Sequence, residues 1–208
     1  ITVLNAEKGL STYSSANFNP SFNLNNSEFK VLDFDEKLNF ETAGGSERWQ
    51  TATGDLDGDG KPEMLIASHG ASSISLLKNT RTSGSVSFEA SLEISTSGGV
   101  KGITLGDING DGKLDLVTAN ERARTFSIYN NTSSSAEVSF ATKVDFATGG
   151  NAARVSIGDI DGDGKIDVII TNNSNFIQVY RNTSAEGALS FATSQTFTTG
   201  SMAYTIAV

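Results

Sequence analysis

Apolar and polar residues alternate along most of the chain with a period of two, which is the pattern of half-buried β-strands. The clearest run covers residues 86–94, where five apolar side chains alternate with Ser and Glu. Related runs lie at residues 32–40, 138–146 and 189–197. No segment keeps the 3.6-residue period of an amphipathic helix. The pattern therefore predicts an all-β protein built from short strands.

A polar loop interrupts this pattern three times at a fixed interval. The loop reads DLDGDGKPE at Asp55–Glu63, DINGDGKLD at Asp107–Asp115 and DIDGDGKID at Asp159–Asp167, so that successive copies are 52 residues apart. One strand-like segment precedes each loop, and three more follow it within the repeat. Four short antiparallel strands in a repeat of about 50 residues are typical of a β-propeller blade.

The repeat predicts how the chain is organised. We expect residues 1–208 to form a single, partial β-propeller of four-stranded antiparallel blades, with about four blades' worth of chain. An Asn- and Ser-rich stretch at about residues 6–30 is expected to be an inserted loop. The end blades of a partial propeller leave open strand edges, so we expect further blades from the same parent chain or from a second molecule. The repeats are expected at about residues 32–85, 86–137, 138–188 and 189–208, the last of them truncated.

The acidic charge of the chain is concentrated in these loops. They hold 11 of the 24 Asp and Glu residues, and the formal net charge is −9. An acidic balance argues against a nucleic-acid partner, which calls for a basic face. The chain has no Cys, which excludes disulfides and thiolate metal sites. No apolar run approaches the length of about 18 residues that a membrane span needs.

The loops gather the kind of side chains that bind calcium. Each loop has side-chain oxygens at positions 1, 3, 5 and 9, and oxygen atoms are the ligands that Ca²⁺ prefers. A Gly at position 6 permits the sharp turn around an ion. An EF-hand would need Glu at position 12 and flanking helices, but position 12 is occupied by Ile66, Thr118 and Ile170. Ordinary Asp-Gly hairpin turns explain one such loop better than three in register.

The repeats resemble the FG-GAP/VCBS family, whose calcium-bearing blades also occur in the β-propeller of integrin α chains. The resemblance rests on the three acidic loops, and it implies a parent propeller of seven blades. The Gly-Ala-Pro segment of FG-GAP repeats is replaced by Ala67-Ser68-His69 and its equivalents, so the likeness is closer to bacterial VCBS-type proteins. Calcium sites of moderate affinity indicate an extracellular protein, secreted or at the cell surface.

The resemblance also implies a ligand set for the ion. In that family, side chains at positions 1, 3, 5 and 9 and the backbone carbonyl at position 7 hold Ca²⁺. Because Asn109 removes one formal charge, we expect the second site to bind most weakly. The longer Glu63 side chain is expected either to offer both oxygens or to crowd the ion. Three structural calcium sites are thus expected, at Asp55, Asp57, Asp59, Lys61 and Glu63; at Asp107, Asn109, Asp111, Lys113 and Asp115; and at Asp159, Asp161, Asp163, Lys165 and Asp167.

The face opposite the calcium loops is the candidate for binding a partner. Strand direction alternates in an antiparallel blade, so the turns after strands two and four lie on that face. Exposed aromatic and Arg residues are typical of binding hot spots, and integrin-like propellers engage their ligands there. The alternative is that these are solvated loop residues, with Trp49 filling a joint between blades. The candidates are Arg48, Trp49, His69, Arg122, Arg124, Arg154 and Tyr204.

Catalysis finds little support in the sequence, and no catalytic residue is predicted. His69 is the single His of the chain and is expected to be a surface residue of a variable turn. The pattern and the resemblance favour a calcium-stabilised extracellular module for binding, adhesion or spacing, with a protein or a glycan as its ligand. The alternative is a lectin-like propeller, or a non-catalytic module attached to a polysaccharide-active enzyme.

Overall fold

The computed structural model describes two compact units, residues 1–38 and residues 39–208. In the first unit, β1 (Thr2–Asn5) and β2 (Leu10–Tyr13) pair as an antiparallel hairpin. Strand β2 falls within the segment expected to be an inserted loop, and most of that segment lies outside the described residues. The residues described in the structure are 2–5, 10–13, 38–40, 42, 47–83, 85–135, 137–185 and 188–203.

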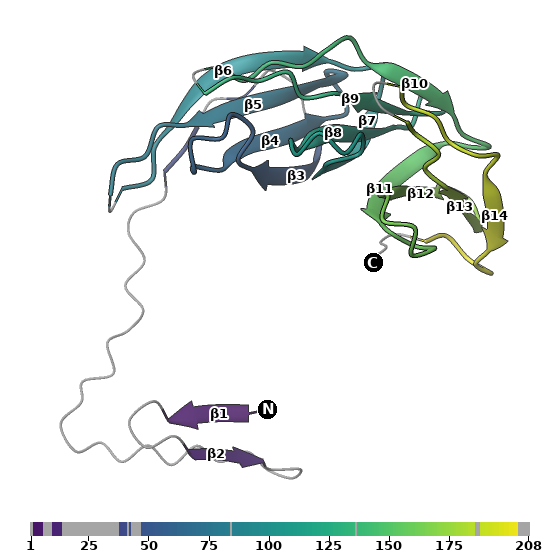
Figure 1. The fold of residues 1–208 in the computed structure, drawn as a ribbon, viewed down its shortest axis with the longest axis horizontal. Helices are drawn as coiled ribbons and strands as arrows, with labels where there is room; N and C mark the ends of the chain where they lie inside the picture. The colour runs from purple at the N-terminus through teal and green to yellow at the C-terminus, as the bar shows by residue number, and fades with distance from the viewer. Residues whose placement is uncertain are drawn as a thin grey trace. The chain divides into compact units, whose positions relative to one another are not determined.

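The second unit consists of three four-stranded antiparallel sheets, here named blades 1, 2 and 3 (Figure 1). Each blade uses four consecutive strands, as the repeat predicts, and the described residues contain strands and no helix. Blade 1 comprises β3 (Arg48–Gly54), β4 (Glu63–Ser68), β5 (Ser73–Asn79) and β6 (Phe88–Ser95). Blade 2 comprises β7 (Val100–Gly106), β8 (Asp115–Asn120), β9 (Thr125–Tyr129) and β10 (Val144–Ala147). Blade 3 comprises β11 (Ala152–Gly158), β12 (Asp167–Asn172), β13 (Phe176–Tyr180) and β14 (Gln195–Thr198).

These sheets confirm the prediction of an all-β protein with four-stranded antiparallel blades. The blades span residues 48–95, 100–147 and 152–198, so each begins within one expected repeat and ends within the next. Among the described residues, no helix is long and apolar enough to cross a membrane.

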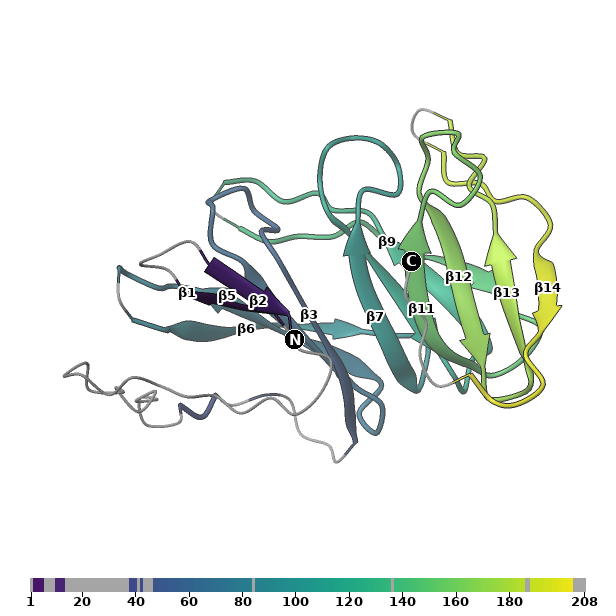
Figure 2. The same cartoon turned by 90° about the horizontal axis from the view of Figure 1, so that it is seen from below.

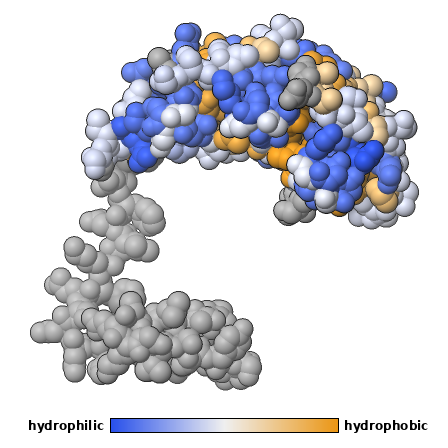
Figure 3. All heavy atoms as spheres, viewed as in Figure 1, coloured by the Kyte–Doolittle hydropathy of each residue, from blue (hydrophilic) through white to orange (hydrophobic). Residues whose placement is uncertain are grey.

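The first strands of the three blades lie side by side, in the order β3, β7 and β11 (Figure 2). One hydrophobic core joins blades 1 and 2, and a second joins blades 2 and 3. Phe126 occupies the second core with no exposed surface, and its ring stacks on Phe146 with the centroids 4.9 Å apart. Hydrophobic residues are visible between the hydrophilic outer parts of the blades in Figure 3. Burial of apolar surface in these two cores therefore stabilises the packing of neighbouring blades.

The fourth strand is interrupted in blades 2 and 3, where the sequence has Thr142 and Thr193 at positions that the alternation would give to apolar residues. Phe140 and Phe191 form isolated bridges with Asn131 and Asn182, and regular pairing begins later, in β10 and β14. Ser133 Oγ accepts a hydrogen bond from the backbone N–H of Ser139 (3.0 Å). Such side-chain bonds compete with the strand ladder. The alternating apolar residues mark packing positions here, but not one continuous strand.

Candidate functional site

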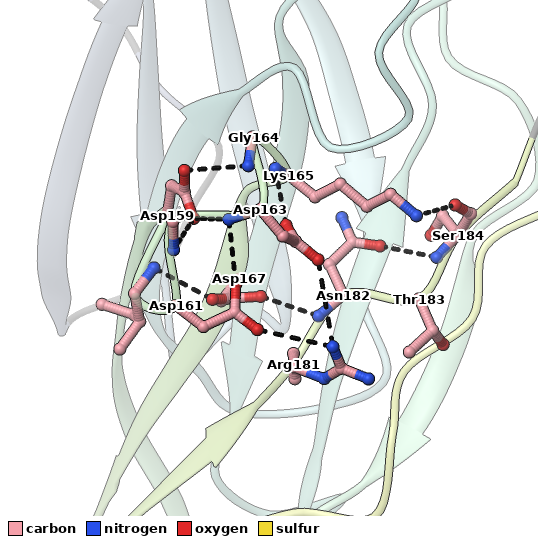
Figure 4. Close-up of polar contacts among 12 residues, drawn as sticks. Asp159, Asp161, Asp163, Gly164, Lys165, Asp167, Arg181, Asn182, Thr183 and Ser184 are labelled. Atoms are coloured by element: carbon pink, nitrogen blue, oxygen red, sulfur yellow. Dashed lines mark hydrogen bonds and ion pairs between the residues drawn. The ribbon is translucent and has the colours of Figure 1, made fainter.

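Each acidic loop joins the first and second strands of a blade and is folded around its first carboxylate. In the first loop, the N–H of Gly58 donates to Asp55 Oδ1 (2.8 Å) and the N–H of Gly60 donates to Asp55 Oδ2 (2.9 Å). Both glycines have positive φ, of 78° and 80°, which a side chain would strain. The same two bonds recur at Asp107 and at Asp159. Figure 4 shows the third loop.

The acid at position 9 is buried and ties the loop to the blade. Asp115 has no exposed surface, and its carboxylate accepts hydrogen bonds from the N–H of Ile108 (3.1 Å) and of Asn131 (2.8 Å). Glu63 and Asp167 accept the equivalent pairs of bonds. Burial raises the pKa of Asp115 and of Glu63, although the backbone donors oppose the shift. Keeping these groups ionised at neutral pH therefore costs free energy, which a bound cation would offset.

Carboxylates at positions 1, 3 and 9 come together in the first and third loops, the two loops that have an acid at all three positions. Carboxylate oxygens of Asp55, Asp57 and Glu63 lie within 4.8 Å of one another. The equivalent residues of the third loop are brought equally close, and these are Asp159, Asp161 and Asp167. Several anionic oxygens converging on one point is the donor set that fits a hard divalent cation.

Position 5 is not part of these groups. Asp59, Asp111 and Asp163 each accept a hydrogen bond from the backbone N–H two residues later, at 2.8 to 2.9 Å. Asp59 is also paired with Lys61 Nζ (2.9 Å), and the hydrogen bond from Lys61 lowers the pKa of Asp59. Ligation by position 5 and by the carbonyl at position 7, the backbone oxygens of Lys61, Lys113 and Lys165, stays a prediction.

A cation at or just after the end of the third strand faces position 3 in the first and third loops but not in the second. Lys78 Nζ lies 3.0 Å from Asp57 Oδ2, and Arg181 Nη1 lies 3.4 Å from Asp161 Oδ2. Asn130 occupies the matching position in the second repeat, where Asn109 stands at position 3 of the loop. The missing carboxylate is thus accompanied by a missing cation. The charge argument for a weaker second site is correspondingly smaller than the sequence of the loop suggests.

An asparagine just after the third strand of blades 2 and 3 connects neighbouring loops, and sequence reasoning missed it. Asn131 Nδ2 donates to the carbonyl oxygens of Leu56 in the first loop (2.9 Å) and Leu114 in the second (3.0 Å). Asn182 repeats this contact between the second and third loops. The signal was the Asn-Thr pair that recurs at residues 79, 131 and 182. We call Asn131 and Asn182 the asparagine clamps. Each of them holds the backbones of two neighbouring acidic loops together.

A pocket lies on the face opposite the acidic loops. Trp49 is 46% exposed, with Lys101 Nζ 4.8 Å and Arg154 Cζ 5.3 Å from its ring centroid. The cavity has a volume of about 270 Å³. It is lined by Trp49, Lys101, Ala153, Arg154, Asn173, Met202 and Ala203.

His69 corrects one expectation for this face, because it is buried and not a surface residue. Its side chain lies between two carboxylates, with Nδ1 2.6 Å from Glu47 Oε2 and Nε2 2.8 Å from Glu121 Oε2. The sequence signal was available, since Glu121 stands 52 residues after His69. Through these contacts His69 links the turn of blade 1 to the turn of blade 2.

The remaining candidates of this face are distributed more widely. Arg48 donates two hydrogen bonds to Thr42 Oγ1, and Arg124 donates one to Asn151 Oδ1 (3.1 Å). Arg122 is exposed. Tyr204 lies outside the described residues.

Comparison with known proteins identifies the repeats. No curated protein matches the chain. A family model described as FG-GAP-like repeat matches three overlapping segments, residues 55–118, 107–170 and 159–208. Each matched segment begins at the first carboxylate of an acidic loop. Together these matches cover most of the chain, which therefore belongs to the family of FG-GAP-like repeat proteins.

Proposed function

We propose that the chain is a calcium-stabilised, extracellular propeller module that binds a protein or a glycan. The observation that carries the calcium assignment is the convergence of positions 1, 3 and 9 in two loops, with oxygens within 4.8 Å. FG-GAP-like repeats are generally structural or binding modules, which supports the binding role. The likeness to VCBS-type repeats supports a bacterial, secreted or cell-surface origin.

Calcium has a structural role in this proposal. In the third loop, Asp159, Asp161 and Asp167 would hold the ion, and the equivalent residues would do so in the other loops. At a dissociation constant of about 0.1 mM and about 1 mM calcium, each site adds roughly 1.4 kcal/mol to the free energy of unfolding. The free energy of unfolding of a folded domain is typically about 5–15 kcal/mol. Three calcium sites would supply on the order of a third of it.

The kind of ligand can be decided by two binding assays on the calcium-loaded protein. For an adhesion module we expect calcium-dependent binding to cells or proteins and no signal on a glycan array. Specific sugar binding that is lost in Trp49→Ala would instead assign a lectin-like function. Lysis or turnover of a polysaccharide by this chain alone would contradict the non-catalytic role.

We also propose that a further blade covers blade 3. Residues Leu56 and Ile108, at position 2 of the first two loops, are 3% exposed, whereas the equivalent Ile160 is 46% exposed. In the first two loops this residue is buried in the cores that join neighbouring blades. A blade from the parent chain or from a second molecule would cover Ile160 in the same way. Light scattering tests this, because an isolated chain that stays monomeric at high concentration would contradict it.

A further inference from the structure

The pocket on the face opposite the acidic loops is formed by a feature that all three blades share. The pairing of β3 with β4 shifts register between Arg48 and Gln50, so that Trp49 is the extra residue of a β-bulge. Lys101 and Ala153 are the extra residues of the equivalent bulges in blades 2 and 3. Bulges redirect side chains and are common beside binding sites. Here they bring an indole, an ammonium group and a methyl group to one cavity.

The charge of this pocket is not balanced by the described residues. Lys101 Nζ donates to Glu121 Oε1 (2.7 Å), and Glu121 also contacts His69 and Asn173. Arg154 has no carboxylate partner among the described residues, where its guanidinium donates to the carbonyl oxygen of Ala153 (2.8 Å). The guanidinium of Arg154 is therefore available to pair with an anionic group of a ligand.

The hydrogen-bonding groups of the pocket favour a ligand that only accepts. Three of the four polar side chains that line the pocket, those of Trp49, Lys101 and Arg154, carry donors and no acceptor, and the amide of Asn173 carries both. A neutral sugar hydroxyl both donates and accepts, whereas a carboxylate accepts at two oxygens and fits the planar guanidinium. The other lining residues include the apolar Met202 and Ala203. Apolar side chains beside Trp and Arg are typical of protein-binding hot spots.

We propose that this pocket binds an Asp or Glu side chain of an acidic peptide segment in a partner protein. Arg154 holds the carboxylate, Lys101, which is paired with Glu121, donates a further hydrogen bond, and Trp49 with Met202 contacts the apolar neighbours of that residue. The cavity of about 270 Å³ is slightly smaller than the usual pocket for a drug-sized ligand, about 300–1,000 Å³. A cavity of this size suits a single side chain of a peptide. The inference rests on the proposed binding role and names the chemistry of its ligand.

The test begins with a selection of short random peptides displayed on phage against the calcium-loaded protein. We expect the selected peptides to be enriched in Asp or Glu. The fluorescence of Trp49, the single Trp of the chain, should then change with saturation as a selected peptide is added. Replacing the acidic residue of that peptide by its amide should weaken binding by at least about tenfold.

Variants of the protein complete the test. Arg154→Gln should weaken peptide binding by at least about tenfold, and Arg154→Lys should restore part of it. Lys143→Gln removes the same charge outside the pocket and should leave binding unchanged. Equal thermal melting of the three variants in calcium shows that each is folded.

Three outcomes overturn the inference: selected peptides without acidic enrichment, peptides that bind Arg154→Gln as well as the original protein, and a fluorescence response to sodium glucuronate alone. If one of these outcomes is found and calcium still raises the thermal midpoint, the inference about the acidic peptide is wrong and the proposed calcium role stands. If the peptide binds through Arg154 but calcium does not change the thermal midpoint, the inference about the pocket stands and the proposed calcium role is wrong.

Discussion

Replacing Asp115 by Ala is expected to lower the free energy of unfolding by about 2–6 kcal/mol. The carboxylate of Asp115 has no exposed surface and satisfies two backbone N–H groups, those of Ile108 and Asn131. The substitution leaves both donors buried without an acceptor, and each such loss costs about 1–3 kcal/mol. It also removes a proposed calcium ligand. Chemical denaturation with and without calcium measures both effects.

Asp111→Ala is the matched control, because Asp111 is an exposed acid of the same loop. Without calcium, the control should change the free energy of unfolding little, since relief of charge repulsion offsets the two exposed hydrogen bonds that Asp111 accepts from the N–H of Lys113 and from Asn109 Nδ2. Asp115→Ala should remain strongly destabilising without calcium. Equal effects of the two variants in metal-free buffer would show that Asp115 does not anchor the loop.

Gly102→Ala is expected to destabilise the junction of blades 2 and 3 by about 1–3 kcal/mol. A Cβ at Gly102 would lie 2.9 Å from Arg154 Cα and from the backbone nitrogen of Val155. Both are backbone atoms of β11, so β7 and β11 would have to move apart. The midpoint of thermal unfolding, compared with that of the original protein, measures the loss.

Gly106→Ala, in the same strand, separates backbone contact from crowding in general. The added Cβ would lie 2.3 Å from Ile157 Cδ1, which is the end of a flexible side chain. Rotation of that side chain can relieve the contact, so we expect a smaller loss than for Gly102→Ala. The reverse order would mean that the blades do not meet at Gly102 as closely as described.

Local patterns predicted the blades because each strand signal is contained in a few neighbouring residues. The alternation before and after each loop became β7 with β8 and β11 with β12, and the fixed spacing of the loops gave one sheet per repeat. The interruption before β10 was not predictable in this way. It accompanies side-chain bonds such as that of Ser133 to Ser139, which a period-two pattern does not register, and Thr142 is the one polar residue that breaks the alternation there.

Long-range contacts account for what the sequence did not reveal about the site. Asn131 bonds to the carbonyl of Leu56, 75 residues earlier, and nothing around Asn131 indicates that partner. His69 lies beside Glu121 only because blades 1 and 2 pack with their turns at the same level. The bulge at Trp49 adds one residue to a strand, which a period-two pattern does not register.

The asparagine clamps suggest how calcium would stabilise more than its own loops. Asn131 bonds to residues of the first and second loops, and its backbone N–H donates to Asp115. An ion that fixes Asp115 would therefore also fix the contact between blades 1 and 2. The central claim is that cations bound by these carboxylates stabilise the packed blades.

The most direct measurement is the midpoint of thermal unfolding in about 1 mM calcium and after removal of calcium by a chelator. The account predicts that calcium raises the midpoint by about 10 °C, and that a variant with Asn at Asp55, Asp107 and Asp159 loses this response. An identical midpoint with and without calcium would contradict it.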